Sequence, residues 1–241
     1  MKNILSLFII LLLVSCSEQK LESNTFELLP STQQFSINSV ESTLDASALQ
    51  WTFSAQENTL PIRYGVLKNL AQIETAEIAQ IHFSINHKAG QQAESYSLKI
   101  EEKKIRIEAQ DEAGLFYAFV TLSQIIDDAQ GQALPILEIN DAPKIAFRPI
   151  QIDIKHHLEK KTYYYELMDY LAQLKINGVI LEIEDKLQYK RRPEVGSEDA
   201  MTIEQWKAIS EYAHERNINI SPLVQGLGHA SFVLKHENNF P

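Results

Sequence analysis

The stretch Val179-Ile180-Leu181-Glu182-Ile183-Glu184 decides how the second half of the chain folds. Its length and apolar content predict a β-strand, in which alternate side chains share a face, so that Glu182 and Glu184 lie opposite Leu181 and Ile183. Strands of a parallel sheet are normally apolar on both faces, because burying an unpaired carboxylate is costly. An acidic face near the end of this strand therefore calls for a physical explanation.

Segments of alternating type lie on both sides of this strand. A strand is predicted from Pro149 to Lys155, and a helix follows it, which Asn177-Gly178 ends with a left-handed cap. Thr202 and Gln205 form a capping box that opens a second helix, and a third strand runs from Ile218 to Val224. The inward-facing residues predicted for the two helices are Tyr164, Leu167, Met168, Leu171 and Leu174, and Ile203, Trp206, Ile209, Tyr212 and Ala213. This order predicts a parallel sheet, either doubly wound or closed as a barrel.

The preceding part of the chain has a different pattern. Strands are predicted at Trp51 to Ala55, Ile81 to Ile85 and Pro135 to Ile139, and a hairpin joins 96–100 to 105–109. A helix with a broad apolar stripe follows, capped by Asp111. We therefore expect a small sheet backed by helices in a first domain, residues 25–143, with the parallel strands in a second, residues 144–241.

The N-terminus has the pattern of a secretory signal. Lys2 precedes about ten apolar residues, too few to span a bilayer stably. The ending Leu13-Val14-Ser15-Cys16 resembles the bacterial lipobox, in which the cysteine is lipidated. Residues 1–16 are thus predicted to be a lipoprotein signal and 17–24 a polar tether, with a short uncleaved anchor as the alternative. The expected location is the cell envelope, membrane-anchored and facing the periplasm or the cell surface.

Composition excludes several classes of protein. The chain has 241 residues, 44% of them hydrophobic, which is typical of a soluble globular protein. Its net charge of −10 disfavours nucleic acid as a partner. A single cysteine excludes an intramolecular disulfide and a cysteine-based zinc site. No cofactor fingerprint appears, and we expect neither a cofactor nor a metal.

The phasing of the strands points to a candidate site. In α/β folds the chemistry lies at the carboxyl ends of the strands. The side chains predicted to meet there and to bind substrate are Asp153, Lys155, Glu182, Glu184 and Gln225. The alternative is structural: the two glutamates lie on an exposed edge or form an ion pair with Lys155.

Several motifs together resemble glycoside hydrolase family 20, the β-N-acetylhexosaminidases. The segment Asp111 to Gln124 is similar to the end of the family's non-catalytic N-terminal domain, and Phe147 to Ile154 resembles its first barrel strand. Leu174-Lys175-Ile176-Asn177 resembles the "K-x-N" that ends the first helix, and Pro222 to His229 resembles the third strand. The resemblance covers about residues 90 to 236.

The resemblance implies a fold and a reaction. The fold is a small α+β N-terminal domain followed by the first three βα units of an incomplete (β/α)8 TIM barrel. The reaction is hydrolysis of terminal N-acetylhexosamine residues of a glycan, assisted by the 2-acetamido group of the sugar itself. Asp185 and His229 would form a relay that adjusts the pKa of the catalytic acid, and Asp153 would support sugar contacts. The alternatives are a helix cap for His229 and a barrel-floor hydrogen bond for Asp153.

The sequence also departs from the family pattern. Commoner members carry an arginine after the first strand, where this chain has Lys155, His156 and His157. Leu223, Gln225 and Leu227 replace acidic and proline positions of the third strand, which favours the hexosaminidase D-like branch. The family's adjacent Asp-Glu pair follows a fourth strand, so we expect a polypeptide of these 241 residues alone to be inactive. A catalytically silent glycan-binding lipoprotein and a truncated product are the alternative interpretations.

Overall fold

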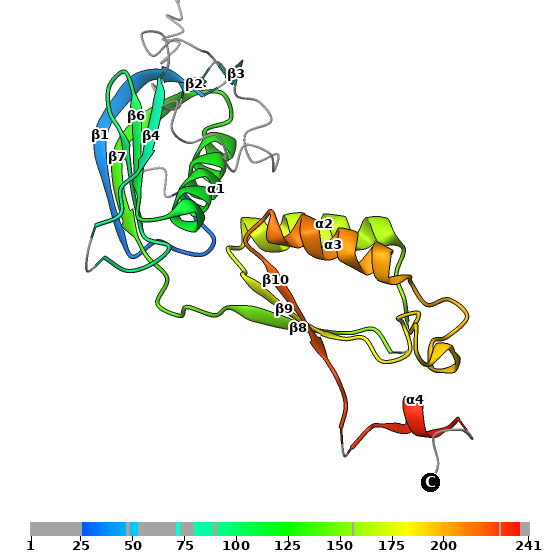
Figure 1. Cartoon of the computed structure of the whole chain (residues 1–241). Helices are drawn as coiled ribbons and strands as arrows, with labels where there is room; N and C mark the ends of the chain where they lie inside the picture. Colours follow the sequence, from blue (N-terminus) through cyan, green and yellow to red (C-terminus); the bar gives the residue numbers. More distant parts are fainter. Residues whose placement is uncertain are drawn as a thin grey trace, which may run out of the picture.

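The computed structural model of the chain describes residues 26–46, 49–52, 71–72, 80–88, 91–155, 157–226 and 228–236. Two sheets organise these residues, one in each half of the chain (Figure 1). The predicted signal, Cys16 and the tether lie outside the described residues, as do residues 53–55 of the first predicted strand.

The N-terminal half contains a mixed sheet of seven strands in the order β1-β7-β5-β6-β4-β2-β3. The predicted hairpin is confirmed: β5 and β6 pair antiparallel, with Leu98 opposite Ile107. Alternation along β6 buries Ile105, Ile107 and Ala109 and exposes the two residues between them. The strand bounds are β1 (Gln34–Asp45), β2 (Gln50–Thr52), β3 (Ala71–Gln72), β4 (Ile81–Ile85), β5 (Tyr96–Ile100), β6 (Ile105–Ala109) and β7 (Ala133–Asp141).

Helix α1 (Glu112–Ala129) packs its apolar residues on this sheet. Its predicted cap is confirmed, since the Asp111 carboxylate accepts a hydrogen bond of 2.7 Å from the backbone N–H of Gly114. Gly114 also allows the helix to lie close to the strand, because a Cβ there would be 2.6 Å from the carbonyl oxygen of Ser95. The cap and the close approach together fix where α1 starts.

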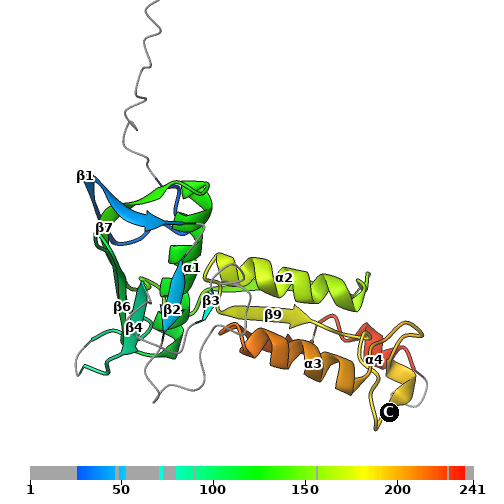
Figure 2. The same ribbon diagram turned by 90° about the horizontal axis from the view of Figure 1, so that it is seen from above.

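The second half contains an open sheet of three parallel strands in the order β10-β9-β8. Helices α2 and α3 lie against one face of this sheet (Figure 1), and Figure 2, turned to look from above, shows the two helices side by side. The predicted alternation of strand and helix is confirmed, and so is the capping box between Thr202 and Gln205. The bounds are β8 (Pro149–Asp153), α2 (Lys161–Gln173), β9 (Gly178–Glu182), a 3₁₀ helix (Pro193–Val195), α3 (Ile203–His214), β10 (Asn219–Leu223) and α4 (Ser231–Leu234).

Two local predictions were wrong. The left-handed residue after α2 is Lys175, with φ 55°, and not the Asn177-Gly178 pair. Gly178 instead begins β9, where its missing side chain makes room for the ring of Phe147, 2.4 Å from an added Cβ. Ile203 was expected to face inward, but it is the first residue of α3 and is 36% exposed.

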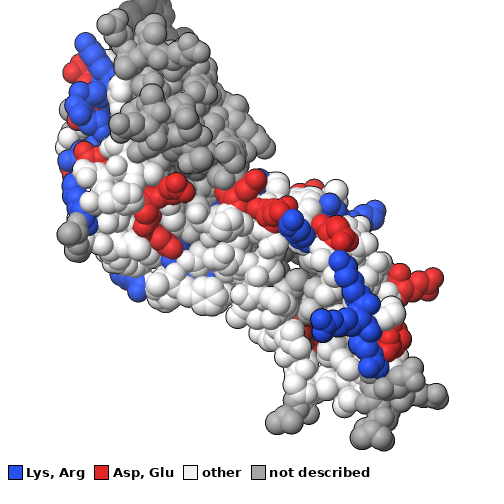
Figure 3. Space-filling view, viewed as in Figure 1, with Lys and Arg blue, Asp and Glu red and all other residues white. Residues whose placement is uncertain are grey.

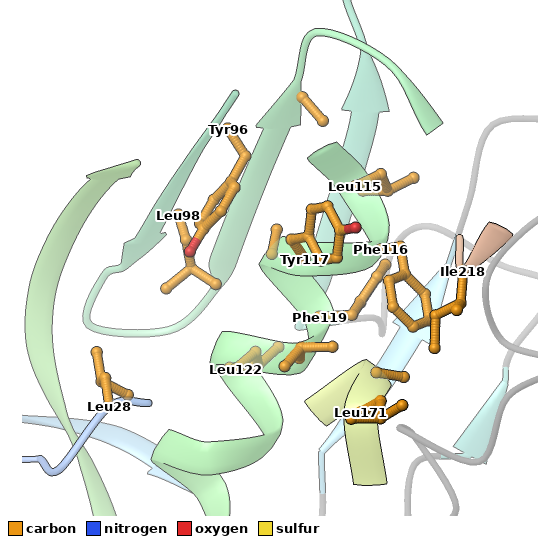
Figure 4. Close-up of a cluster of buried hydrophobic side chains, with 14 of the residues drawn as sticks. Leu28, Tyr96, Leu98, Leu115, Phe116, Tyr117, Phe119, Leu122, Leu171 and Ile218 are labelled. Carbon is orange, nitrogen blue, oxygen red and sulfur yellow. The ribbon is translucent and has the colours of Figure 1, made fainter. Parts of the chain in front are cut away.

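The two halves share one hydrophobic core. Phe116 of α1 lies beside Leu171 of α2 and beside Ile218, which precedes β10 (Figure 4). Phe116 and Ile218 are both fully buried, and Leu171 is 5% exposed. Helix α1 therefore packs on its own sheet with one side and on the second half of the chain with the other.

Candidate functional site

The candidate site lies where the three parallel strands end. Asp153 is the last residue of β8 and pairs in register with Glu182, the last residue of β9. Glu182 pairs in turn with Leu223, which ends β10, and Gln225 follows two residues later. Parallel pairing thus places polar side chains from three separate segments at one edge of the sheet.

Glu182 is the centre of this cluster. Its side chain is only 6% exposed. One carboxylate oxygen accepts hydrogen bonds from Lys155 Nζ at 3.0 Å and Gln225 Nε2 at 2.6 Å, and the other accepts from Gln151 Nε2 at 3.2 Å. Three donors on one carboxylate favour its ionised form. Glu182 is therefore suited to hold Lys155 and Gln225 in place and unsuited to donate a proton near neutral pH.

Lys155 lies between two carboxylates. Its ammonium is 2.8 Å from an oxygen of Asp153 and 3.0 Å from Glu182. The hydrogen bond to Asp153, followed by the one to Glu182, raises the pKa of Lys155. The ion pair between Lys155 and Glu182, foreseen as a structural alternative, is thus present. Asp153 is 42% exposed and Lys155 24% exposed, so both also face solvent.

Acid should weaken the cluster. The hydrogen bonds from Lys155 and then Gln225 lower the pKa of Glu182 from its ordinary value. A carboxyl group with a lower pKa in the folded state stabilises the fold above its unfolded-state pKa, and this contribution is lost as the pH falls through the folded-state pKa. Glu182 and Lys155 therefore both stay charged at neutral pH.

The structure does not bring Glu184 into the cluster. Strand β9 ends at Glu182, and Glu184 adopts a left-handed backbone conformation with φ 38°. The strict alternation assumed from the sequence stops there. The carbonyl oxygen of Glu184 accepts a hydrogen bond of 2.6 Å from the hydroxyl of Tyr189. Within the described residues, no hydrogen bond or ion pair joins the Glu184 carboxylate to the cluster.

Asp185 lies in the loop after β9, and α3 holds this loop. The indole N–H of Trp206 donates to the carbonyl oxygen of Lys186 at 3.0 Å, and the N–H of Ser197 donates to that of Asp185 at 2.8 Å. Oδ1 of Asp185 is buried and has no hydrogen-bond partner in the described part of the chain, although Lys186 Nζ lies 3.6 Å away. This oxygen can accept a further hydrogen bond.

His229 lies near the end of the described residues, just before α4. It is exposed, with φ 57°, in the turn before α4. The N-cap of α4 is Ala230 and carries no side-chain cap, so the alternative of His229 as a helix cap is not observed. No hydrogen bond or ion pair joins His229 to Asp185 in the portion that the structure describes. The proposed relay stays a prediction.

Sequence reasoning missed Gln151 as a member of the cluster. Its place was visible in the pattern, because alternation along β8 puts Gln151 and Asp153 on one face. Only the pairing of β8 with β9 shows that this amide reaches Glu182.

Charged residues of both signs are interspersed over the face shown in Figure 3. Among the described ranges, no group of three or more His, Cys, Asp or Glu side chains is placed to hold a metal ion.

Comparison with known proteins identifies the family. Residues 21–142, just over half of the chain, match glycosyl hydrolase family 20, domain 2. The chain is 32% identical over 91 residues to an N,N'-diacetylchitobiase of Vibrio harveyi, covering 38% of this chain and 10% of that protein. It is 32% identical over 91 residues to hexosaminidase D of Bos taurus, covering 37% and 26%. The assignment to the hexosaminidase D-like branch stays a prediction.

Solved structures share the fold. The β-N-acetylhexosaminidase of Bacteroides fragilis superposes with a TM-score of 0.73 at 20% identity, covering 86% of this chain and 47% of that protein. The chain therefore spans less than half of this structure and about a tenth to a quarter of the two relatives above. The predicted arrangement of an α+β domain before the start of a barrel is confirmed at the level of the fold. Because residues 21–142 match domain 2 of the family, the chain belongs to glycosyl hydrolase family 20.

Proposed function

We propose that the protein is a glycoside hydrolase of the exo-β-N-acetylhexosaminidase type, acting on glycans with terminal N-acetylhexosamine. One observation carries the proposal: in a member of family 20, Asp153, Lys155, Glu182 and Gln225 converge at the carboxyl ends of three parallel strands. The named activities of the relatives, chitobiase and hexosaminidase, support the substrate class.

In this proposal the cluster binds and orients the sugar. Asp153 and Lys155 offer a carboxylate and an ammonium to neighbouring sugar hydroxyls, and Glu182 fixes the position of Lys155. The 2-acetamido oxygen of the sugar attacks the anomeric carbon, while an acid protonates the departing oxygen. Because Glu182 is ionised, we assign that acid to the family's Asp-Glu pair after a fourth strand and not to the cluster.

Replacing Glu182 by glutamine tests this assignment. In the protein as its gene encodes it, we expect kcat/KM for 4-nitrophenyl N-acetyl-β-glucosaminide to fall about 10–100-fold, the range of one to two charge-assisted hydrogen bonds. The loss should appear mainly as a higher KM, because the cluster binds ground state and transition state alike. Initial rates over a range of substrate concentrations measure both constants.

A matched control is Glu166→Gln, an exposed glutamate of α2, which should leave both constants unchanged. A collapse of kcat in Glu182→Gln with KM unchanged would mean that Glu182 is the acid. In the same assay, the relay predicts that Asp185→Asn and His229→Ala lower kcat more than they raise KM. The matching β-glucoside, which lacks the acetamido group, should not be hydrolysed.

A catalytically silent glycan-binding protein is the second candidate. It is favoured by the cluster itself, in which the Glu182 carboxylate is engaged by three donors and no proton donor for the leaving group is apparent among the described residues. Saturation-transfer NMR with N-acetylglucosamine separates the two. Binding that Glu182→Gln weakens, together with no hydrolysis by the gene-encoded protein, would establish the silent form.

We also propose that Cys16 is lipidated and holds the protein on a membrane of the cell envelope. The support is the sequence alone: a charged start, an apolar segment and the lipobox ending at Cys16. None of the helices in the described ranges is long and apolar enough to cross a membrane. Stable anchoring would come from the several acyl chains of a bacterial lipoprotein, because one chain binds only marginally.

Replacing Cys16 by serine should move the protein from the membrane fraction to the soluble fraction and abolish incorporation of labelled palmitate. Ser17→Ala, one residue later, is the matched control and should leave both properties unchanged. Immunoblots of fractionated cells measure the distribution. Unaltered membrane association of Cys16→Ser would show that the apolar segment itself is the anchor.

A further inference from the structure

Two ion pairs cross between the halves of the chain, one of them buried and the other partly buried. Lys175, after α2, is 3.1 Å from the carboxylate of Asp141, at the end of β7. Arg148, before β8, is 2.7 Å from the carboxylate of Glu94, before β5. The N-terminal half supplies both carboxylates and the second half supplies both cations. The two surfaces are therefore complementary in charge as well as joined through the apolar contact of Phe116.

The backbone of Lys175 is strained. It occupies the left-handed region, where glycine is the usual residue after a helix. Its side chain is 7% exposed, and Nζ donates both to Asp141 and to the hydroxyl of Tyr96, at 2.9 Å. The hydroxyl of Tyr96 is in turn hydrogen-bonded to Asp141 and to Thr121 of α1. A glycine would relieve the strain but would leave Asp141 without its cation.

Asn177 and Arg148 hold the segment that connects the two halves. The Asn177 side chain accepts from the N–H of Arg148 at 2.7 Å and donates to the carbonyl oxygen of Ala146 at 2.7 Å. The guanidinium of Arg148 donates to the carbonyl oxygens of Ile145 at 2.9 Å and Lys175 at 2.8 Å. The backbone of this connection is therefore fixed by side chains at several points.

We infer that Lys175 and Asn177 form a clamp that docks the N-terminal domain on the amino-terminal end of the barrel strands, so that the two halves open and unfold together. This assigns a role to the Lys-x-Asn motif that the candidate site does not use. The clamp lies at the opposite end of β9 from Glu182, since Gly178 begins that strand and Glu182 ends it. The inference is independent of the proposed activity.

Removing one member of a buried ion pair is more damaging than removing both charges, because a single charge is left without a partner. Lys175→Met keeps most of the side-chain volume but leaves Asp141 uncompensated. Adding Asp141→Asn removes the second charge while keeping an oxygen to accept hydrogen bonds. The two variants together distinguish the ion pair from mere packing of the lysine stem.

Limited trypsin digestion of the whole chain tests the clamp at the exposed Lys144 in the connection. With Lys175→Met, cleavage after Lys144 should accelerate at least about 10-fold, because proteolysis follows the population of the open form. The exposed Lys207→Met of α3 should change the rate less than about twofold. The double variant should recover protection to within about threefold of the unaltered chain.

If trypsin cleaved Lys175→Met after Lys144 at the same rate as the unaltered chain, the clamp would be refuted. Faster cleavage of the double variant than of Lys175→Met would show that packing, and not charge, joins the halves. If Lys175→Met does not accumulate as soluble protein, Asp141→Asn alone carries the test. It should accelerate cleavage relative to the exposed control Asp128→Asn, and equal rates would overturn the inference.

Discussion

Replacing Phe116 by alanine should lower the free energy of unfolding by about 3–5 kcal/mol, the usual loss for a fully buried aromatic ring. Phe116 has no exposed surface and lies where α1 meets Leu171 and Ile218. The cavity would open between the halves of the chain, so both should lose stability together. Urea titration followed by circular dichroism measures the change.

The control is Phe35→Ala on the edge strand β1, where the ring is 40% exposed. Because less contact is lost there, its effect should stay below about 1.5 kcal/mol. If Phe116→Ala were no more damaging than Phe35→Ala, the two halves could not share a core at this point.

Replacing Trp206 by alanine should be similarly damaging, with a loss of about 3–5 kcal/mol. The ring is 9% exposed and packs edge to face on Tyr164, with centroids 5.3 Å apart. Its N–H also holds the carbonyl oxygen of Lys186, next to Asp185. The variant should therefore lose both stability and the geometry of the loop after β9.

Trp206→Phe separates these two effects. It keeps an aromatic ring in the core but removes the indole donor, so that the Lys186 carbonyl oxygen keeps only the N–H of Met201 at 3.2 Å. We therefore expect a smaller loss of about 0.5–1.5 kcal/mol, the contribution of one hydrogen bond. Urea titrations of both variants, with amide exchange of residues 185–188 by NMR, make the comparison. Equal losses in the two variants would mean that the hydrogen bond, and not the packing, carries the stability.

Local signals in the sequence predicted much of the fold. The alternation in 96–100 and 105–109, the cap at Asp111 and the capping box at Thr202 all act within a few residues, and all three are confirmed. One failure involves a distant partner. Asn177-Gly178 has the pattern of a helix end. Position 178 instead needs a glycine because the ring of Phe147, 31 residues earlier in the chain, packs against it.

The candidate site was predictable to the extent that strand register preserves alternation. Asp153, Lys155, Glu182 and Gln225 meet as the parallel pairing requires. Glu184 does not join them because β9 ends two residues before it. The clamp escaped prediction, since no local pattern shows that Lys175 reaches Asp141, 34 residues earlier.

The residues that join the two halves of the chain are synthesised in a fixed order. Glu94, Phe116 and Asp141 all precede Arg148 and Lys175, so the ribosome completes the acidic docking surface before its basic counterpart emerges. Domains generally fold from the N-terminus during translation. The first domain can thus serve as a template on which β8 and β9 align as they are made. Until Leu171 and Ile218 follow, the Phe116 ring lacks the contacts that bury it in the finished chain, and we expect aggregation to be most favoured in this interval.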